Sequence, residues 1–69
     1  MKINGEAFRK MRENLLLSQY HLAKLAGVTP NVVKSIEQGG LPRFQSIRKL
    51  LSVLNLTVQE AYQDKLLED

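Results

Sequence analysis

The chain has 69 residues, one histidine and no cysteine, and its formal net charge at pH 7 is +3. Without cysteine it has neither a disulfide framework nor a thiolate metal cluster, and His21 alone cannot build a metal site. The apolar runs are far too short to span a membrane, and the first residues do not resemble a signal peptide. We therefore expect one small cytoplasmic domain, residues 1–69, without a metal or other cofactor.

The positive charge is concentrated in the first fifty residues. Residues 1–50 contain nine Lys and Arg against three Glu, whereas residues 51–69 contain one Lys against four acidic residues. A basic surface attracts polyanions, because contacts with phosphates release counterions and supply much of the binding free energy. Many small soluble domains are equally basic, but the uneven distribution favours a nucleic acid as partner.

The first predicted helix covers Gly5 to Asn14, with Asn4 as its N-cap. Phe8 and Met11 recur at the spacing of one helical face, which predicts that this face packs into the core. Arg12 lies on the same apolar face. A guanidinium group at such a position needs a partner, because a buried charge is costly unless it is paired.

The residues from 19 to 38 have the order of small, apolar and polar side chains that a helix-turn-helix requires. One helix covers residues 19–26 and a second covers residues 30–38. Gly27 comes directly after the first of them, where the chain reverses through positive φ and a Cβ would clash. Ala23 lies where the two helices must approach each other closely, so a small side chain is needed there.

The predicted N-caps of these two helices are Ser18 and Thr29, whose hydroxyl groups can accept a hydrogen bond from the first turn. Pro30 suits the first helical position, because the amide that it lacks would have no partner there. The outward residues of the second helix are short, polar or cationic: Thr29, Pro30, Asn31, Lys34, Ser35 and Gln38. Such a face suits contacts with base edges in the major groove of DNA.

A fourth helix is predicted at about residues 43–54, after Gly39 and Gly40 have ended the third. Its apolar stripe consists of Phe44, Ile47, Leu50, Leu51 and Leu54. Asn55 can adopt the left-handed turn that follows, since Asn tolerates positive φ better than most residues.

Thr57 and Glu60 have the spacing of a capping box at the start of a last helix, from Val58 toward Leu66. The apolar residues between Leu56 and Leu67 either form a contact between two copies of the chain or complete the core of one copy. No stretch shows the sustained alternation of a strand, so the predicted class is all-α, a compact five-helix bundle.

These features together resemble the phage Cro/repressor (XRE-like) family of helix-turn-helix proteins. The resemblance extends from Phe8 to Tyr62 and is carried by FRKMRE, by SQYHLAKLAGVTPNVVKSIEQG, and, after a proline and a helix, by LNLTVQEAY. It implies a λ-repressor-like fold that binds double-stranded DNA. The chain departs from the family after the first helix, where relatives often have glycine and this chain has Leu16 or its neighbours. Either a left-handed backbone there is strained or the turn differs. The loop between Gly39 and Pro42 is also shorter than in many relatives.

The resemblance also implies an ion pair, since Arg12 and Glu37 occupy the places of an arginine and a glutamate that pair in the family. The physical chemistry agrees with it. Glu37 lies in the last turn of its helix, where the helix dipole disfavours an anion, so a cationic partner is expected. A bidentate bond would satisfy both this carboxylate and the guanidinium group on the apolar face. We expect the pair to be partly buried and structural.

Contacts that position the protein on DNA are expected from Gln19, Arg43, Gln38 and Lys10. Gln19 opens a helix, whose free amides attract phosphate, and the family's corresponding glutamine contacts the backbone. The resemblance places Arg43 beside phosphates as well. Base contacts are expected from Thr29, Pro30, Asn31, Lys34 and Ser35. Asn can bond adenine at two points, and Lys can donate to guanine.

The function that these observations favour is a sequence-specific transcriptional regulator, a repressor that binds a palindromic operator as a homodimer. Antitoxins, controllers of restriction systems, and lysogeny or plasmid repressors all remain open within this class. A second class is a protein-interaction adaptor or antirepressor that uses the same fold without affinity for DNA. An enzyme is the least favoured class, since the sequence has no phosphate loop, metal-ligand spacing or nucleophile–base pair. No small-molecule ligand or membrane partner is indicated.

Overall fold

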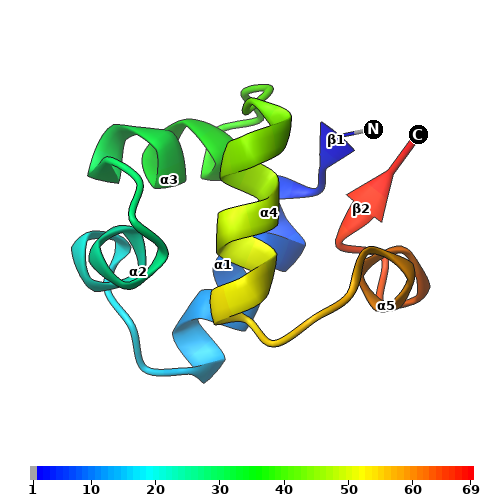
Figure 1. Cartoon of the computed structure of the whole chain (residues 1–69), viewed down its shortest axis with the longest axis horizontal. Coiled ribbons are helices and arrows are strands. Elements are labelled where there is room, and N and C mark those ends of the chain that lie inside the picture. Colours follow the sequence, from blue (N-terminus) through cyan, green and yellow to red (C-terminus); the bar gives the residue numbers. More distant parts are fainter. Residues whose placement is uncertain (1) are drawn as a thin grey trace.

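Five helices and a short two-stranded sheet make up the fold. The computed structural model describes residues 2–69 and is shown in Figure 1. The helices occur in the order and near the positions that the sequence predicts, which confirms the all-α class. In chain order the elements are β1 (Lys2–Ile3), α1 (Gly5–Asn14), α2 (Gln19–Ala26), α3 (Pro30–Glu37), α4 (Phe44–Val53), α5 (Val58–Gln63) and β2 (Leu67–Glu68).

Three helices begin with the side-chain caps that the sequence predicts. Oδ1 of Asn4 caps α1 at 3.1 Å and Oγ of Ser18 caps α2 at 3.0 Å, each accepting from the amide three residues further on. Thr57 and Glu60 form a complete capping box at the start of α5, with hydrogen bonds of 3.1 and 3.0 Å. Each cap satisfies amides that the helix itself leaves without a partner.

The predicted side-chain cap of α3 is wrong. Thr29 occupies the N-cap position with an extended backbone, but its hydroxyl accepts no hydrogen bond from the helix. Pro30 has no amide to donate, and the amide of Val32 donates to the carbonyl oxygen of Thr29 at 3.0 Å. The Thr29 side chain is therefore exposed at the start of α3 and is not used by the helix.

α2 packs against both α3 and α4, so it holds α3 in place. Leu22 and Ala23 of α2 are fully buried, together with Val33 and Ile36 of α3 and Leu50 of α4. The methyl group of Ala23 permits the close helix approach that the sequence predicts. Burial of one large aliphatic side chain contributes about 1.5–3 kcal/mol, so these few residues fix the orientation of α3.

The apolar stripe of α4 is shorter than the sequence predicts. Ile47, Leu50 and Leu51 are buried, but Phe44 is 53% exposed. Phe44 is the first residue of α4, and the first turn of this helix lies outside the core. Helical periodicity identifies the face of a residue but not how far along the helix the neighbouring elements extend.

The end of the chain differs from the prediction. α5 ends at Gln63, and β2 pairs antiparallel with β1, with Leu67 opposite Ile3. The amide of Asn4 also donates to the carbonyl oxygen of Leu66 at 2.7 Å. Strands of two residues are too short to show alternation, so no pattern in the sequence predicts them. Leu66 and Leu67 are buried, which assigns the end of the predicted apolar segment to the core of one copy.

Each of the four turns between the described helices contains a residue with positive φ, including Gly39 at 94° after α3. Gly27 ends α2 with φ 75°, as predicted, and Asn55 follows α4 with φ 59°. Leu16, between α1 and α2, has φ 58°, which is the strained conformation that the departure from the family's glycine suggested. A branched side chain in this region costs roughly 1–2 kcal/mol, because its Cβ approaches the following carbonyl oxygen.

α1 begins in direct backbone contact with the end of α3. A Cβ atom at Gly5 would lie 2.6 Å from the carbonyl oxygen of Ile36 and 3.0 Å from that of Glu37. Real Cβ atoms do not approach a backbone oxygen so closely, so the absence of a side chain at Gly5 lets the two helices meet. This contact sets α1 beside the last turn of α3.

Candidate nucleic-acid interface

The outward face of α3 is polar and exposed. All six residues that the sequence places there are exposed, namely Thr29, Pro30, Asn31, Lys34, Ser35 and Gln38. The opposite face, through Val33 and Ile36, is fully buried against the rest of the fold. Gln38 lies one residue beyond the end of the helix as its C-cap, not within it as the sequence predicts. α3 therefore presents its polar groups to solvent on a helix that the core holds firmly.

A groove of about 390 Å³ joins this face to the start of α4. It is lined by Asn31, Val32, Ser35, Leu41, Pro42, Arg43 and Ser46. Two of the predicted base-contacting residues, Asn31 and Ser35, thus share a groove with the predicted phosphate contact Arg43. Arg43 is the N-cap of α4, and no side chain caps that helix. The first amides of α4 and the exposed guanidinium group therefore lie at the same edge of the groove, as an anion-binding helix start requires.

Behind α3, the structure brings Arg12 and Glu37 together. Nε of Arg12 donates to Oε2 of Glu37 at 2.6 Å and Nη2 donates to Oε1 at 3.1 Å. Nη1 of Arg12 donates to the carbonyl oxygen of Leu17 at 2.8 Å. The side chains of the two ionic residues are only 11% and 5% exposed. One guanidinium group thus connects α1, the turn before α2, and the last turn of α3.

Gln19 lies beside this ion pair. Its Nε2 donates to Oε1 of Glu37 at 3.0 Å, and the residue is half-buried. Part of its amide is therefore committed to the carboxylate, a role that the sequence analysis missed. The signal was present: a carboxylate that accepts two bonds from one arginine still has free lone pairs, and Gln19 begins the neighbouring helix.

The surroundings of Glu37 shift its acidity. Burial alone raises the pKa of this carboxyl group, but hydrogen bonds from Arg12 and Gln19 outweigh burial, and the pKa lies below its usual value. The pKa of Arg12 is raised, chiefly by its hydrogen bond with Glu37. Both groups are therefore held in their charged forms, as in a structural ion pair.

The other predicted phosphate contact, Lys10, is exposed on α1. Its Nζ lies 3.7 Å from Oε1 of Glu6, one helical turn earlier. The two side chains are 68% and 71% exposed, so solvent screens this pair and the ammonium group can reach other partners. Arg9 and Lys24 are exposed as well.

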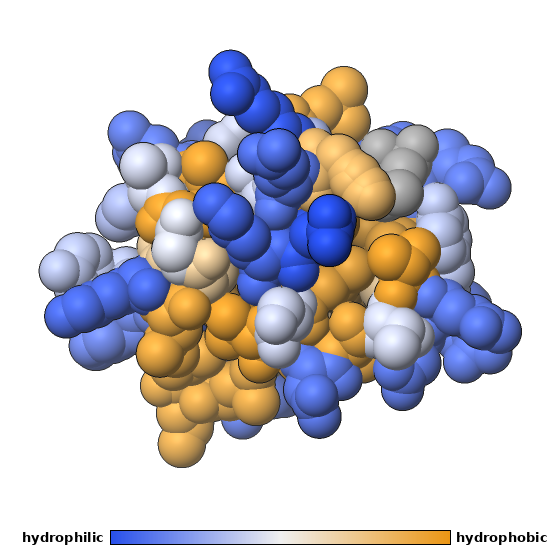
Figure 2. All heavy atoms as spheres, viewed as in Figure 1, coloured by the Kyte–Doolittle hydropathy of each residue, from blue (hydrophilic) through white to orange (hydrophobic). Residues whose placement is uncertain are grey.

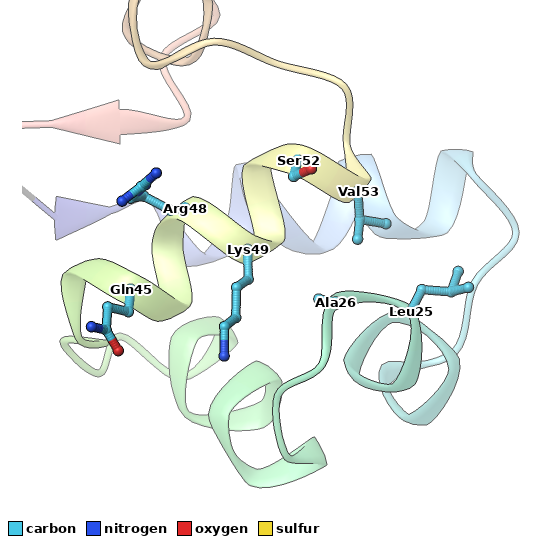
Figure 3. A pocket seen from close by; sticks show the side chains of 7 residues that line it. All are labelled: Leu25, Ala26, Gln45, Arg48, Lys49, Ser52 and Val53. Atoms are coloured by element: carbon cyan, nitrogen blue, oxygen red, sulfur yellow. The ribbon is translucent and has the colours of Figure 1, made fainter.

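A larger groove, of about 610 Å³, opens between α2 and α4 (Figure 3). Its lining includes Leu25 of α2 and Gln45, Arg48 and Lys49 of α4. Figure 3 shows that the residues of α4 come from successive turns of that helix. The lining contains no carboxylate, and its polar side chains are those of Gln45, Arg48, Lys49 and Ser52.

Residues 2–69 contain neither a cluster of metal-ligating side chains nor a helix that could cross a membrane. No group of three or more His, Cys, Asp or Glu side chains in these residues could hold a metal ion. None of the helices that the structure describes is long and apolar enough to cross a membrane. The polar face of α3 and the adjoining groove form the candidate interface.

Comparison with protein families agrees with this surface. A family model described as helix-turn-helix matches residues 8–60, from the middle of α1 to α5. A search of curated proteins gave no significant match. The match includes α2, α3 and the whole of the groove at the start of α4. Since it covers most of the chain, the protein belongs to the XRE-type helix-turn-helix family of DNA-binding transcription regulators.

Proposed function

We propose that the protein reads a specific sequence of double-stranded DNA with α3 and represses transcription by occupying an operator. The observation that carries the proposal is the exposed polar face of α3, held against the core by Val33 and Ile36. A helix of this width fits the major groove, where base pairs present distinct patterns of donors and acceptors. This role requires no cofactor and no catalysis.

The residues divide by chemistry. Asn31 suits adenine, Lys34 suits guanine, and the exposed Thr29 and Pro30 suit a thymine methyl group, with Ser35 able to bond either kind of base. Arg43 and the amides at the start of α4 are assigned to phosphate, together with Gln38 and Lys10. For Gln19 we retain a phosphate contact through the part of its amide that Glu37 does not engage. Such contacts position the protein without reading sequence.

One copy covers only half of a symmetric site. We propose that two copies bind a palindromic operator, as phage repressors of this family do, with half-sites about one helical turn, roughly 34 Å, apart. The acidic residues among positions 51–69 would repel phosphates, so we place that end of the protein away from DNA.

A protein-interaction adaptor with the same fold is the second candidate. Adaptor surfaces that bind proteins are usually apolar at their centre. The polar, cationic face of α3 does not have this composition, which favours DNA.

The test is Lys34→Ala on a duplex obtained by selection from random DNA. If Lys34 reads a base, the variant should bind this duplex about 1–3 kcal/mol more weakly, whereas its binding to unrelated duplexes should change little. Lys49→Ala is the matched control, because it removes the same charge from an exposed position on α4. Fluorescence anisotropy titrations at several salt concentrations measure both effects.

Each alternative has its own outcome. If Lys34→Ala weakens binding to every duplex equally, Lys34 contacts a phosphate and does not read a base. If the wild-type protein binds no duplex even at low ionic strength, the DNA-binding role must be abandoned in favour of the adaptor, since phosphate contacts are strongest there.

A further inference from the structure

An apolar surface lies at the end of α1, far from the polar face of α3. Leu16 is 92% exposed, more than any other large apolar residue of the described chain, and Leu15 beside it is exposed too. Figure 2 shows hydrophobic surface at the lower edge of the molecule, where Figure 1 places the end of α1 and the following turn. We call this surface the Leu16 patch; it consists of Leu16 and the five pocket residues named below.

Leu16 is unfavourable in the isolated chain in two ways. Its side chain exposes apolar area to water, and its backbone lies in the left-handed region at φ 58°. Glycine would avoid both costs, and Asn, which occupies the similar turn at Asn55, would reduce them. A strained backbone that carries an exposed apolar side chain points to a contact that the side chain makes with another molecule.

A pocket adjoins this leucine. It has a volume of about 190 Å³ and is lined by Met11, Asn14, Leu15, Leu54 and Leu56. None of these side chains is charged, and the exposed lining is mainly apolar. A leucine side chain therefore matches the pocket in chemistry and is small enough to enter it.

We propose that a second copy of this chain binds the Leu16 patch. Leu16 of each copy enters the pocket of the other, so a two-fold axis passes between the projecting leucine and the pocket. Such an interface is self-complementary and closes on itself as a dimer. The uncharged lining agrees with a second copy as the occupant. A two-fold axis would place any charged side chain of the patch close to the same side chain of the other copy, and the two would repel each other.

The proposed contact leaves the polar face of α3 open. Leu54 in the pocket is the C-cap of α4, whereas Arg43 beside the polar face is the N-cap of the same helix. The two positions are eleven residues apart, which corresponds to about 16 Å along the helix. Association through the Leu16 patch is therefore compatible with DNA binding and does not depend on it.

The first test compares the self-association of wild-type protein and Leu16→Gly by sedimentation velocity over a concentration series, without DNA. Glycine removes the projecting side chain twice in each dimer and suits the left-handed backbone, so the variant should remain folded. We expect its dimer dissociation constant to rise at least about 100-fold. Leu25→Gln is the matched control, because it removes another exposed leucine, from α2, and should associate like wild type.

The second test uses the two-fold arrangement itself. Asn14→Lys places a charge at the pocket while leaving Leu16 in place, so this variant alone should also be monomeric. An equimolar mixture of Leu16→Gly and Asn14→Lys should associate, more weakly than wild type, because one intact leucine then meets one intact pocket. Circular dichroism confirms that each variant is folded.

The proposal would be overturned if the wild-type protein stays monomeric up to about 1 mM. It would also be overturned if Leu16→Gly associates as tightly as wild type, or if Leu25→Gln weakens association as much as Leu16→Gly does. Failure of the mixture to associate would have the same consequence. None of them bears on the DNA-binding role, which is measured by the affinity of the same variants for a single half-site. Leu16→Gly should keep that affinity.

Discussion

Arg12→Ala removes the guanidinium group that connects α1, the turn before α2, and the end of α3. It leaves the Glu37 carboxylate, 5% exposed, with only the hydrogen bond from Gln19, and it leaves the carbonyl oxygen of Leu17 without its donor. Loss of one partner of a buried ion pair costs roughly 3–5 kcal/mol. Because Arg12 itself is 11% exposed and water can partly replace it, we expect about 3 kcal/mol.

This loss is large for so small a protein. A domain of this size has a free energy of unfolding of roughly 3–10 kcal/mol, and 1 kcal/mol shifts its Tm by about 4–8 °C. Arg12→Ala should therefore lower the Tm by at least about 12 °C and move the midpoint of urea unfolding, both followed by circular dichroism at 222 nm, the helix signal.

The control lies on the same helix. Lys10→Ala breaks the exposed pair with Glu6 and should change the free energy of unfolding by no more than about 0.5 kcal/mol. In a double-mutant cycle, Arg12→Met with Glu37→Leu should cost less than the sum of the single changes, since neither charge is then left unpaired. If the unfolding curve of Arg12→Ala superimposed on that of wild type, the ion pair would not have the structural role assigned to it.

Three further predictions follow from particular contacts. The pKa of Glu37 is lower in the folded protein than in the unfolded chain, where it is about 4.5, so the ionised carboxylate stabilises the fold. This contribution is complete above about pH 4.5 and is lost as the pH falls through the lower pKa of the folded state. Urea unfolding should therefore show wild type losing more stability than Glu37→Gln between about pH 5 and pH 3, and parallel losses would contradict the assignment. Gly5→Ala should destabilise the protein by about 1–2 kcal/mol in spite of the better helix propensity of alanine, because its Cβ would meet the carbonyl oxygen of Ile36; a higher Tm would show that α1 can move away. Leu16→Gly, in dilute solution, should raise the free energy of unfolding by about 0.5–1 kcal/mol through relief of the left-handed strain, and an unchanged midpoint would show that Leu16 is not strained.

The sequence predicted most of what depends on local chemistry, although the hydroxyl of Thr29 does not cap α3. The caps at Asn4 and Ser18, the capping box and the left-handed turn at Asn55 each follow from one or two neighbouring residues, and all occur in the structure. The buried faces of α2 and α3 follow from helical periodicity, which also determines their outward residues.

The features that the sequence did not predict depend on distant parts of the chain. The exposure of Phe44 depends on where the neighbouring helices stop, and the bond from Gln19 to Glu37 depends on how α2 meets the end of α3. The need for glycine at position 5 arises from a backbone contact with residues more than thirty positions away. None of these has a local pattern, because each is a property of the packed molecule.

The pairing of β1 with β2 determines where the chain can be extended. Lys2 and Glu68 lie opposite each other in this pair, at the edge of the molecule that faces away from α2 and α3 in Figure 1. A fluorescent label or a fused domain at either terminus would therefore project from this one edge and leave the polar face of α3 unobstructed. Removal of either terminal segment would deprive the other of its hydrogen-bonding partner, so trimming at one end should loosen both.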